Sequence, residues 1–228
     1  IRFAKAFDGF DARAAGGYFR FKKRDVHINI PYESVSGNDQ TRDAWMFEVL
    51  CHEASHAFLQ FYKTPVRIRP WLNEGLANYM AFYITRTSAP RLARHSRTRK
   101  HFVNVLALRL RRDGLRPLKT LAAQFVMPPT DTEGYAMAWA LVGFMAEYKP
   151  RAFVRLIDLL KEDPYIKTTN VKGKDRADAL RKFEEKIAKS NAYQEKVFQE
   201  AFGISIEKFE TIWLQWMRKN IQRLHKIL

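Results

Sequence analysis

One short pattern constrains this chain more than any other feature of its sequence. Residues 52–56 read His-Glu-Ala-Ser-His, an HExxH pattern. On a helix, two histidines four positions apart lie on one face, so both imidazoles can reach a single tetrahedral Zn²⁺ ion. Catalytic zinc needs a third protein ligand and an open fourth position. Glu74, in a second stretch that reads Trp-Leu-Asn-Glu-Gly-Leu-Ala, is the candidate for that third ligand.

The alternative interpretation of HExxH, without a metal ion, is a surface helix that carries a pair of histidines and a glutamate. The flanks argue against it, because apolar residues precede and follow the pattern and predict a buried helix. Buried histidine and glutamate side chains are costly unless they are paired, and a metal ion satisfies them. Glu53 lies beside the two histidines and is the expected general base, which polarises a zinc-bound water. Gly75 and Ala77 are expected to let the Glu74 stretch approach the first helix closely.

HExxH followed by glutamate in the setting Asn-Glu-Gly-Leu-Ala resembles the gluzincin zinc metallopeptidases. This is the clan of thermolysin and the M1 aminopeptidases, and the likeness is strongest to its compact peptidase-MA-like families. A third segment, which begins with Gly134 and Tyr135, resembles the tyrosine-bearing helix start of M1-type enzymes. The motifs lie between about residues 45 and 145, so the resemblance covers less than half of the chain.

The resemblance implies further roles. Tyr135 would steady the tetrahedral intermediate, although a core tyrosine is an equal alternative. Asn78, one turn after the third ligand, stands where thermolysin-like enzymes have an acidic residue that accepts the N–H of the first zinc histidine. Here the acceptor would be an uncharged amide oxygen. An edge strand that lies along the substrate backbone by β-augmentation would be formed by His27, Ile28 and Asn29.

The overall pattern predicts an α+β protein that is rich in helix. A small N-terminal β-sheet is expected to pack on a helical metallopeptidase core, followed by a mostly α-helical C-terminal part. Alternating apolar residues predict strands over 18–22 and 26–30. Helices are expected over 41–62, from the Glu74 stretch through Ile84, over 97–112, from a Thr130 cap to Tyr148, and over 151–161, 176–189, 192–202 and 205–224. We expect one domain over 1–228, with a strand-rich part at 1–40, catalytic helices at 41–148 and a helical part at 149–228.

The chain has a formal net charge of +16, and its basic residues are unevenly spread. Residues 86–119 contain eleven lysines and arginines against one acid, Asp113. Such a segment is either a solvated helix face or a surface that attracts an acidic partner. Nucleic acid is disfavoured as that partner, because no groove-reading or base-stacking motif accompanies the charge. Arg67 and Arg69 are expected to be exposed, with a place in the cleft as the alternative.

No apolar run approaches the ~20 residues of a membrane-spanning helix, so no transmembrane segment is expected. The chain begins at Ile1 without a methionine, which favours an exported protein (periplasmic, secreted or at the cell envelope) whose signal or anchor is absent from this chain. The single cysteine, Cys51, excludes an internal disulfide and leaves the compartment open.

Together these features predict a zinc-dependent peptide-bond hydrolase that binds one Zn²⁺ per chain and acts on a peptide or protein substrate. The predicted ligands are His52, His56 and Glu74. An endopeptidase is favoured, because no motif for binding an N-terminal amine is recognisable. Two alternatives stay open: a catalytically silent zinc-containing binding or scaffold domain, and a zinc hydrolase of a non-peptide amide such as a cell-wall polymer.

Overall fold

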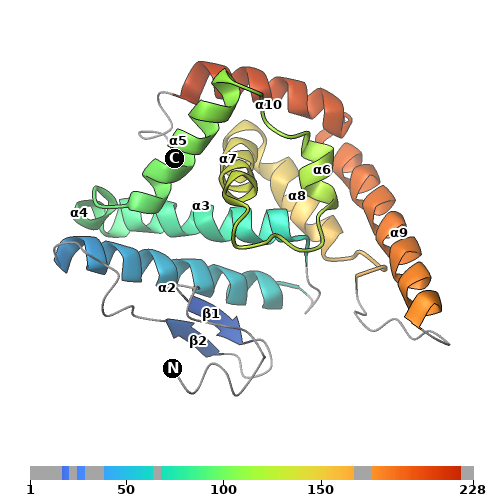
Figure 1. Ribbon diagram of the computed structural model, residues 1–228, viewed down its shortest axis with the longest axis horizontal. Coiled ribbons are helices and arrows are strands. Elements are labelled where there is room, and N and C mark those ends of the chain that lie inside the picture. Colours follow the sequence, from blue (N-terminus) through green and yellow to red (C-terminus); the bar gives the residue numbers. More distant parts are fainter. Residues whose placement is uncertain (1–16, 21–24, 29–38, 64–67, 167–175, 222–228) are drawn as a thin grey trace.

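The computed structural model describes residues 17–20, 25–28, 39–63, 68–166 and 176–221 (Figure 1). These described residues form two short strands and nine helices. The strands are β1 (Gly17–Arg20) and β2 (Asp25–Ile28). The helices are α2 (Asp39–Phe61), α3 (Pro70–Ser88), α4 (Pro90–Ala93), α5 (Arg97–Arg111), α6 (Leu118–Ala123), α7 (Thr132–Tyr148), α8 (Pro150–Leu160), α9 (Arg176–Phe202) and α10 (Ile206–Asn220).

The predicted α+β class is wrong, because the described chain is overwhelmingly helical and its strands form no sheet that could serve as a layer. β1 and β2 pair only as an antiparallel ribbon of four residues each, from Gly17 opposite Ile28 to Arg20 opposite Asp25. A ribbon this small cannot build a core. The ribbon lies against α2, and the described residues of the hydrophobic core lie almost entirely in helices.

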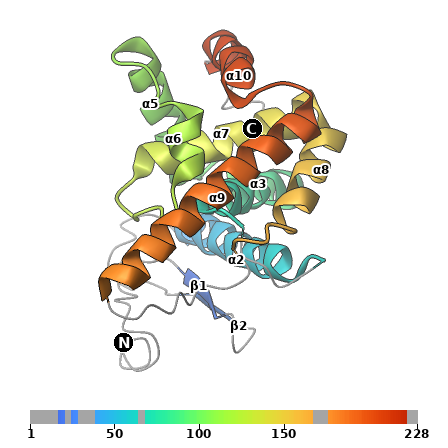
Figure 2. The same ribbon diagram turned by 90° about the vertical axis from the view of Figure 1, so that its right-hand side faces the viewer.

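Three stacked helices organise the molecule. α3 packs between α2 and α7 in both views (Figures 1 and 2). α7 is apolar on every side, and all of its residues from Ala136 to Met145 are buried, as expected for a helix surrounded by neighbours. The ring of Trp139 on α7 lies 5.6 Å from Phe82 of α3 and 5.9 Å from Phe102 of α5. The helix that carries Glu74 is therefore held from both sides.

The C-terminal helices complete the same core. Phe209 and Trp213 of α10 are fully buried. The Phe209 ring lies 4.9 Å from Phe198 of α9 and 5.4 Å from Phe144 of α7. One cluster of buried apolar residues runs from Cys51 to Met217.

Two helices were expected over 176–189 and 192–202, but the structure has a single helix, α9. The predicted break falls at Ser190 and Asn191, whose polar side chains often end helices by bonding to the nearby backbone. Here the side-chain oxygens of both residues accept hydrogen bonds from Arg69 instead. The helix therefore continues through them.

Candidate metal centre

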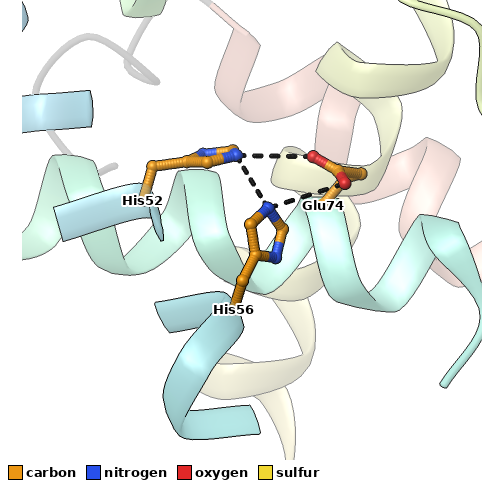
Figure 3. Close-up of side chains that lie close together, drawn as sticks. All are labelled: His52, His56 and Glu74. Atoms are coloured by element: carbon orange, nitrogen blue, oxygen red, sulfur yellow. Dashed lines mark hydrogen bonds and ion pairs between the residues drawn. The ribbon is translucent and has the colours of Figure 1, made fainter. Parts of the chain in front are cut away.

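The two histidines and the glutamate come from facing sides of α2 and α3. His52 and His56 project from α2 toward α3, and Glu74 projects back from the second turn of α3 (Figure 3). The two Nε2 atoms lie 3.0 Å apart. The Glu74 carboxylate lies 3.4 Å from His52 Nε2 through one oxygen and 3.6 Å from His56 Nε2 through the other. The predicted ligand triad is thus brought together around one point.

These separations fit a tetrahedral zinc ion. Zinc binds imidazole nitrogen and carboxylate oxygen at about 2.0–2.2 Å, which places neighbouring ligand atoms of a tetrahedron about 3.3–3.5 Å apart. The three observed distances, 3.0, 3.4 and 3.6 Å, bracket this value. Two histidines and one carboxylate also match the donor set of catalytic zinc sites, which leave a fourth position open. Among the described residues, no other group of three potential ligands lies this close together.

The electrostatics of the triad favour binding a cation. Burial raises the pKa of Glu74, but the hydrogen bond of His52 and the charges of both histidines bring it below the ordinary value, so the carboxylate is anionic. Burial lowers the pKa of His56 despite the charge of Glu74. Burial opposes protonation of His52 as well, but the hydrogen bond and charge of Glu74 and the charge of Glu53 raise its pKa. An incoming metal ion would displace that proton.

Two asparagines of α3 support the histidines from outside the triad. Asn78 donates its amide N–H to the Glu74 carbonyl at 2.9 Å, which leaves its amide oxygen to accept from His52. That contact agrees with the predicted place of Asn78 behind the first zinc histidine. Asn73 hydrogen-bonds to His56, which offsets only a small part of the lowering of the His56 pKa by burial. The sequence pattern did not single out Asn73; its only signal was its position next to Glu74.

Glu53 is buried on α2, with 6% of its surface exposed, and its charge acts on His52. A general base must lie near the attacking water, so a buried carboxylate adjacent to a residue of the triad is a candidate for that role. The assignment of Glu53 as that base stays a prediction.

Gly75 was expected to let α3 approach α2, but it faces α7. A Cβ atom there would lie 2.5 Å from the carbonyl oxygen of Ala138 and 2.9 Å from Cγ2 of Val142. Both contacts are too short for real carbon atoms. The missing side chain therefore sets the spacing between α3 and α7, directly beside the Glu74 ligand.

Tyr135 lies in the first turn of α7, partly buried, and its hydroxyl donates to the Met127 carbonyl at 3.4 Å. Burial raises its pKa, and the negative charges of Glu74 and Asp131 add to the effect. The hydroxyl therefore stays protonated, and the charge of the Glu74 carboxylate contributes to its raised pKa. No hydrogen bond between Tyr135 and the triad is present among the described residues, and its catalytic role stays a prediction.

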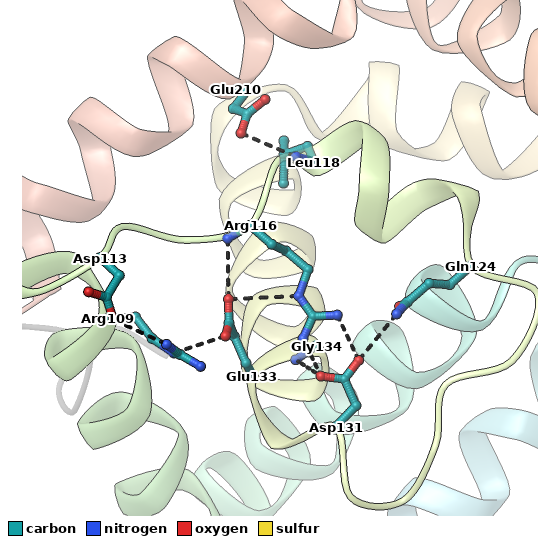
Figure 4. A network of polar contacts seen from close by, with 9 residues as sticks. All are labelled: Arg109, Asp113, Arg116, Leu118, Gln124, Asp131, Glu133, Gly134 and Glu210. Carbon is teal, nitrogen blue, oxygen red and sulfur yellow. Dashed lines mark hydrogen bonds and ion pairs between the residues drawn. The ribbon is translucent and has the colours of Figure 1, made fainter.

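A polar network fixes the start of α7 (Figure 4). Thr130 was predicted to cap this helix, but Asp131 does so, by accepting from the Gly134 N–H at 3.0 Å. Arg116 binds the same carboxylate with both terminal nitrogens. Glu133, in the first turn of the helix, binds Arg109 at 2.9 Å. The network thereby anchors the turn that carries Tyr135.

The predicted substrate strand is only partly described. His27 and Ile28 lie in β2, whereas Asn29 falls outside the described residues. Both views place the ribbon on one side of α2 and α3 on the other (Figures 1 and 2). The structure therefore does not bring β2 beside Glu74, and the role of this strand in substrate binding stays a prediction.

The expected exposure of Arg69 is wrong: only 1% of its surface is exposed. Arg69 precedes α3, and its guanidinium reaches Ser190 and Asn191 of α9, both at 2.7 Å. Its plane also covers the Phe125 ring, 3.8 Å from the ring centre. Sequence reasoning missed these contacts because Ser190 and Asn191 are more than 100 residues away along the chain. Arg67 lies outside the described residues.

Comparison with known proteins identifies the family. No match was found among curated proteins or among solved structures. A family model described as "protein of unknown function (DUF1570)" matches residues 47–166, which include the whole ligand triad and Tyr135. Because this segment is more than half of the chain, the protein belongs to the DUF1570 family.

Proposed function

We propose that the protein is a zinc-dependent hydrolase of peptide bonds. The observation that carries this proposal is the convergence of His52 Nε2, His56 Nε2 and the Glu74 carboxylate at separations of 3.0–3.6 Å. A buried Glu53 beside them argues against a purely structural zinc site, because such a site has no use for a base.

Each residue then has one task. A zinc ion held by the triad would lower the pKa of a water ligand to about 7 and polarise a carbonyl group. Glu53 takes the proton from the attacking water and passes it to the leaving amine. Asn78 and Asn73 hold the rings of His52 and His56 in orientation. Tyr135, which keeps its proton, would donate a hydrogen bond to the oxyanion in place of its bond to the Met127 carbonyl.

The first experiment is metal content per chain, combined with cleavage of a peptide library before and after chelation. About one zinc and cleavage that chelation abolishes would support the proposal. One zinc with cleavage of cell-wall fragments, but not of peptides, would favour a non-peptide amide as substrate. One zinc without any cleavage would favour a scaffold. No zinc, even after zinc is added back, would refute the proposal.

The role of Glu53 has a separate test. Glu53→Gln is expected to keep about one zinc per chain and to lower turnover by a factor of at least ~10². Glu48→Gln is the matched control, since Glu48 is also a buried glutamate of α2 but lies one turn before His52. It should leave turnover unchanged. Retained turnover in Glu53→Gln would remove Glu53 from the mechanism.

We also infer that the basic segment, residues 86–119, attracts an acidic polypeptide. The ion pairs in the structure distinguish the cations that already bind an acid from those that could bind such a partner. Arg109, Arg116 and Lys119 are already paired with acids. A second group of cations lies exposed on α4, α5 and the residues beside them. No acid among the described residues lies within ion-pair distance of this group. This group consists of Arg91, Arg94, Lys100, Arg111 and Arg112.

Cleavage or binding of polyglutamate-tagged peptides tests this inference. The combined variant Arg91→Ala, Arg94→Ala and Lys100→Ala should weaken binding severalfold and flatten its salt dependence. Lys119→Ala, which removes an already paired cation, is the control. Equal binding by both variants would contradict the inference.

None of the described helices is long and apolar enough to cross a bilayer.

A further inference from the structure

The end of α2 and the start of α3 lie side by side (Figure 1). One short segment after α8 contacts the end of α2 directly and is linked to the start of α3 through Ser190 of α9. Lys161, with 1% of its surface exposed, donates to the carbonyl of Gln60 in the last turn of α2 at 3.2 Å. Gln60 is one turn beyond His56. The segment therefore holds the helix that supplies the histidines.

Two residues further along, Asp163 is linked to the start of α3 through α9. Asp163 is fully buried and accepts a hydrogen bond from Ser190 Oγ of α9 at 2.6 Å. The same Ser190 oxygen accepts from Arg69 at 2.7 Å. Arg69 opens α3, because its carbonyl accepts the N–H groups of Leu72 and Asn73 at 3.1 and 3.0 Å. The chain Asp163–Ser190–Arg69 therefore ends in the turn just before Glu74.

A second set of hydrogen bonds also connects α9 to the first turn of α3. Trp71 of α3 donates its indole N–H to the Gln194 side chain at 2.8 Å, and Gln194 donates onward to the Ala122 carbonyl at 3.0 Å. All three side chains that α9 contributes, Ser190, Asn191 and Gln194, lie on one stretch of that helix. They also lie outside residues 47–166, the segment matched by the family model.

Stability alone does not account for such a group of buried polar residues. Burial lowers the pKa of Arg69 to about 10, and the charge of Asp163 offsets this only in part. Buried ion pairs are often replaceable by apolar residues without loss of stability, whereas their directional hydrogen bonds define one geometry. The site that needs a defined geometry lies one turn away: His56 sits before Gln60, and Glu74 sits just after Asn73.

We propose that Arg69, Lys161, Asp163 and Ser190, here called the polar clasp, are positioning residues that fix the separation between the His52–His56 helix and Glu74. In this proposal α9 contributes to the geometry of the metal site, although it supplies none of the proposed ligands. This inference rests on the proposed zinc site, whose ligands the clasp never touches.

The test compares Arg69→Met and Ser190→Ala with wild type. Zinc affinity is measured by competition with a chromophoric chelator, ligand geometry by the visible absorption spectrum of the Co²⁺-loaded protein, and folding by thermal unfolding without metal. Both variants are expected to remain folded, to bind zinc about 10–100-fold more weakly and to show an altered Co²⁺ spectrum. Arg69→Lys, which keeps the charge and one donor, should recover part of the affinity.

Arg155→Met is the matched control, because Arg155 also joins α8 to α9, through Glu200 at 2.8 Å, but on the exposed surface. It should leave zinc affinity and the Co²⁺ spectrum unchanged. Wild-type affinity and an unchanged spectrum in both clasp variants would overturn the inference while leaving the zinc site intact. If Arg69→Met does not fold, the same readouts on Ser190→Ala decide. Absence of zinc binding in wild type would refute the proposed function itself.

Discussion

Replacing Gly75 by alanine sets helix propensity against packing. Alanine is favoured over glycine inside a helix by about 1 kcal/mol, so propensity alone predicts a more stable protein. The added Cβ, however, would lie 2.5 Å from the Ala138 oxygen, 2.8 Å from the Ala138 carbonyl carbon and 2.9 Å from Val142 Cγ2. These contacts are roughly 1 Å shorter than the optimum for carbon atoms.

Two of the three atoms belong to the backbone of α7 and cannot rotate away. Overpacking of a core by one methyl group typically costs about 1–3 kcal/mol. We take the upper part of that range, about 2–3 kcal/mol, because α3 or α7 must move as a whole. After the gain in propensity of about 1 kcal/mol, the expected net loss is about 1–2 kcal/mol. Movement of α3 would also carry Glu74 and weaken zinc binding by about tenfold.

Urea unfolding of the metal-free protein and zinc competition measure the two effects separately. Gly203→Ala is the control, because Gly203 has a φ of +73° and no atom within 4 Å of an added Cβ. It should lose about 1 kcal/mol through backbone strain alone and keep wild-type zinc affinity. A Gly75→Ala protein that is more stable than wild type and binds zinc equally well would refute the packing argument.

Two further predictions concern pH. Burial raises the pKa of Glu48 from 4.5 to about 7, against a hydrogen bond from Ser96 and the charge of Arg99. As the pH rises, Glu48 loses its proton at a lower pH in the unfolded chain than in the folded protein. Glu48 therefore lowers the free energy of unfolding as the pH rises from 4.5 to about 7. Glu48→Gln should therefore stabilise the protein by about 3 kcal/mol at pH 8 and hardly at pH 4; urea unfolding at both values checks this, and an equal gain at both would contradict it. Burial opposes ionisation of Asp131, but the hydrogen bonds of Arg116 and Gly134 bring its pKa below the ordinary value. The stability it contributes is thus present above pH ~4 and lost as the pH falls through the lowered pKa. Asp131→Ala should cost about 2 kcal/mol at pH 7 and much less at pH 2, as seen by thermal unfolding; the same cost at both values would argue against this role.

The residues of the ligand triad were predictable because their chemistry is local. His52 and His56 are one helical turn apart, so the pattern alone places both on one face. Glu74 was identified by residue type and by the helix around it. Helix bounds followed for the same reason, and α2, α5 and α8 begin and end within two residues of the expected positions.

The misplaced features depend on contacts between distant segments. The α+β class came from two alternating runs that form only a small ribbon, because no further strand among the described residues joins them. The cap of α7 went to Asp131 and not to Thr130 because Arg116 holds the Asp131 carboxylate. The short helices α4 and α6 were not predicted; each is too brief to show a clear apolar period.

The groups that can bind a metal ion are recognisable without a structure, because the spacing of residues on a helix is a property of the backbone and needs no partner. How those groups are held depends on contacts between helices that are far apart in the chain. The distance from His56 to Glu74 depends on how α2, α3 and α7 stack, on the missing side chain of Gly75, and on buried Arg69, whose partners Ser190 and Asn191 lie more than 100 residues away. Such contacts arise when helices pack, since close packing and burial select which polar groups must find one another.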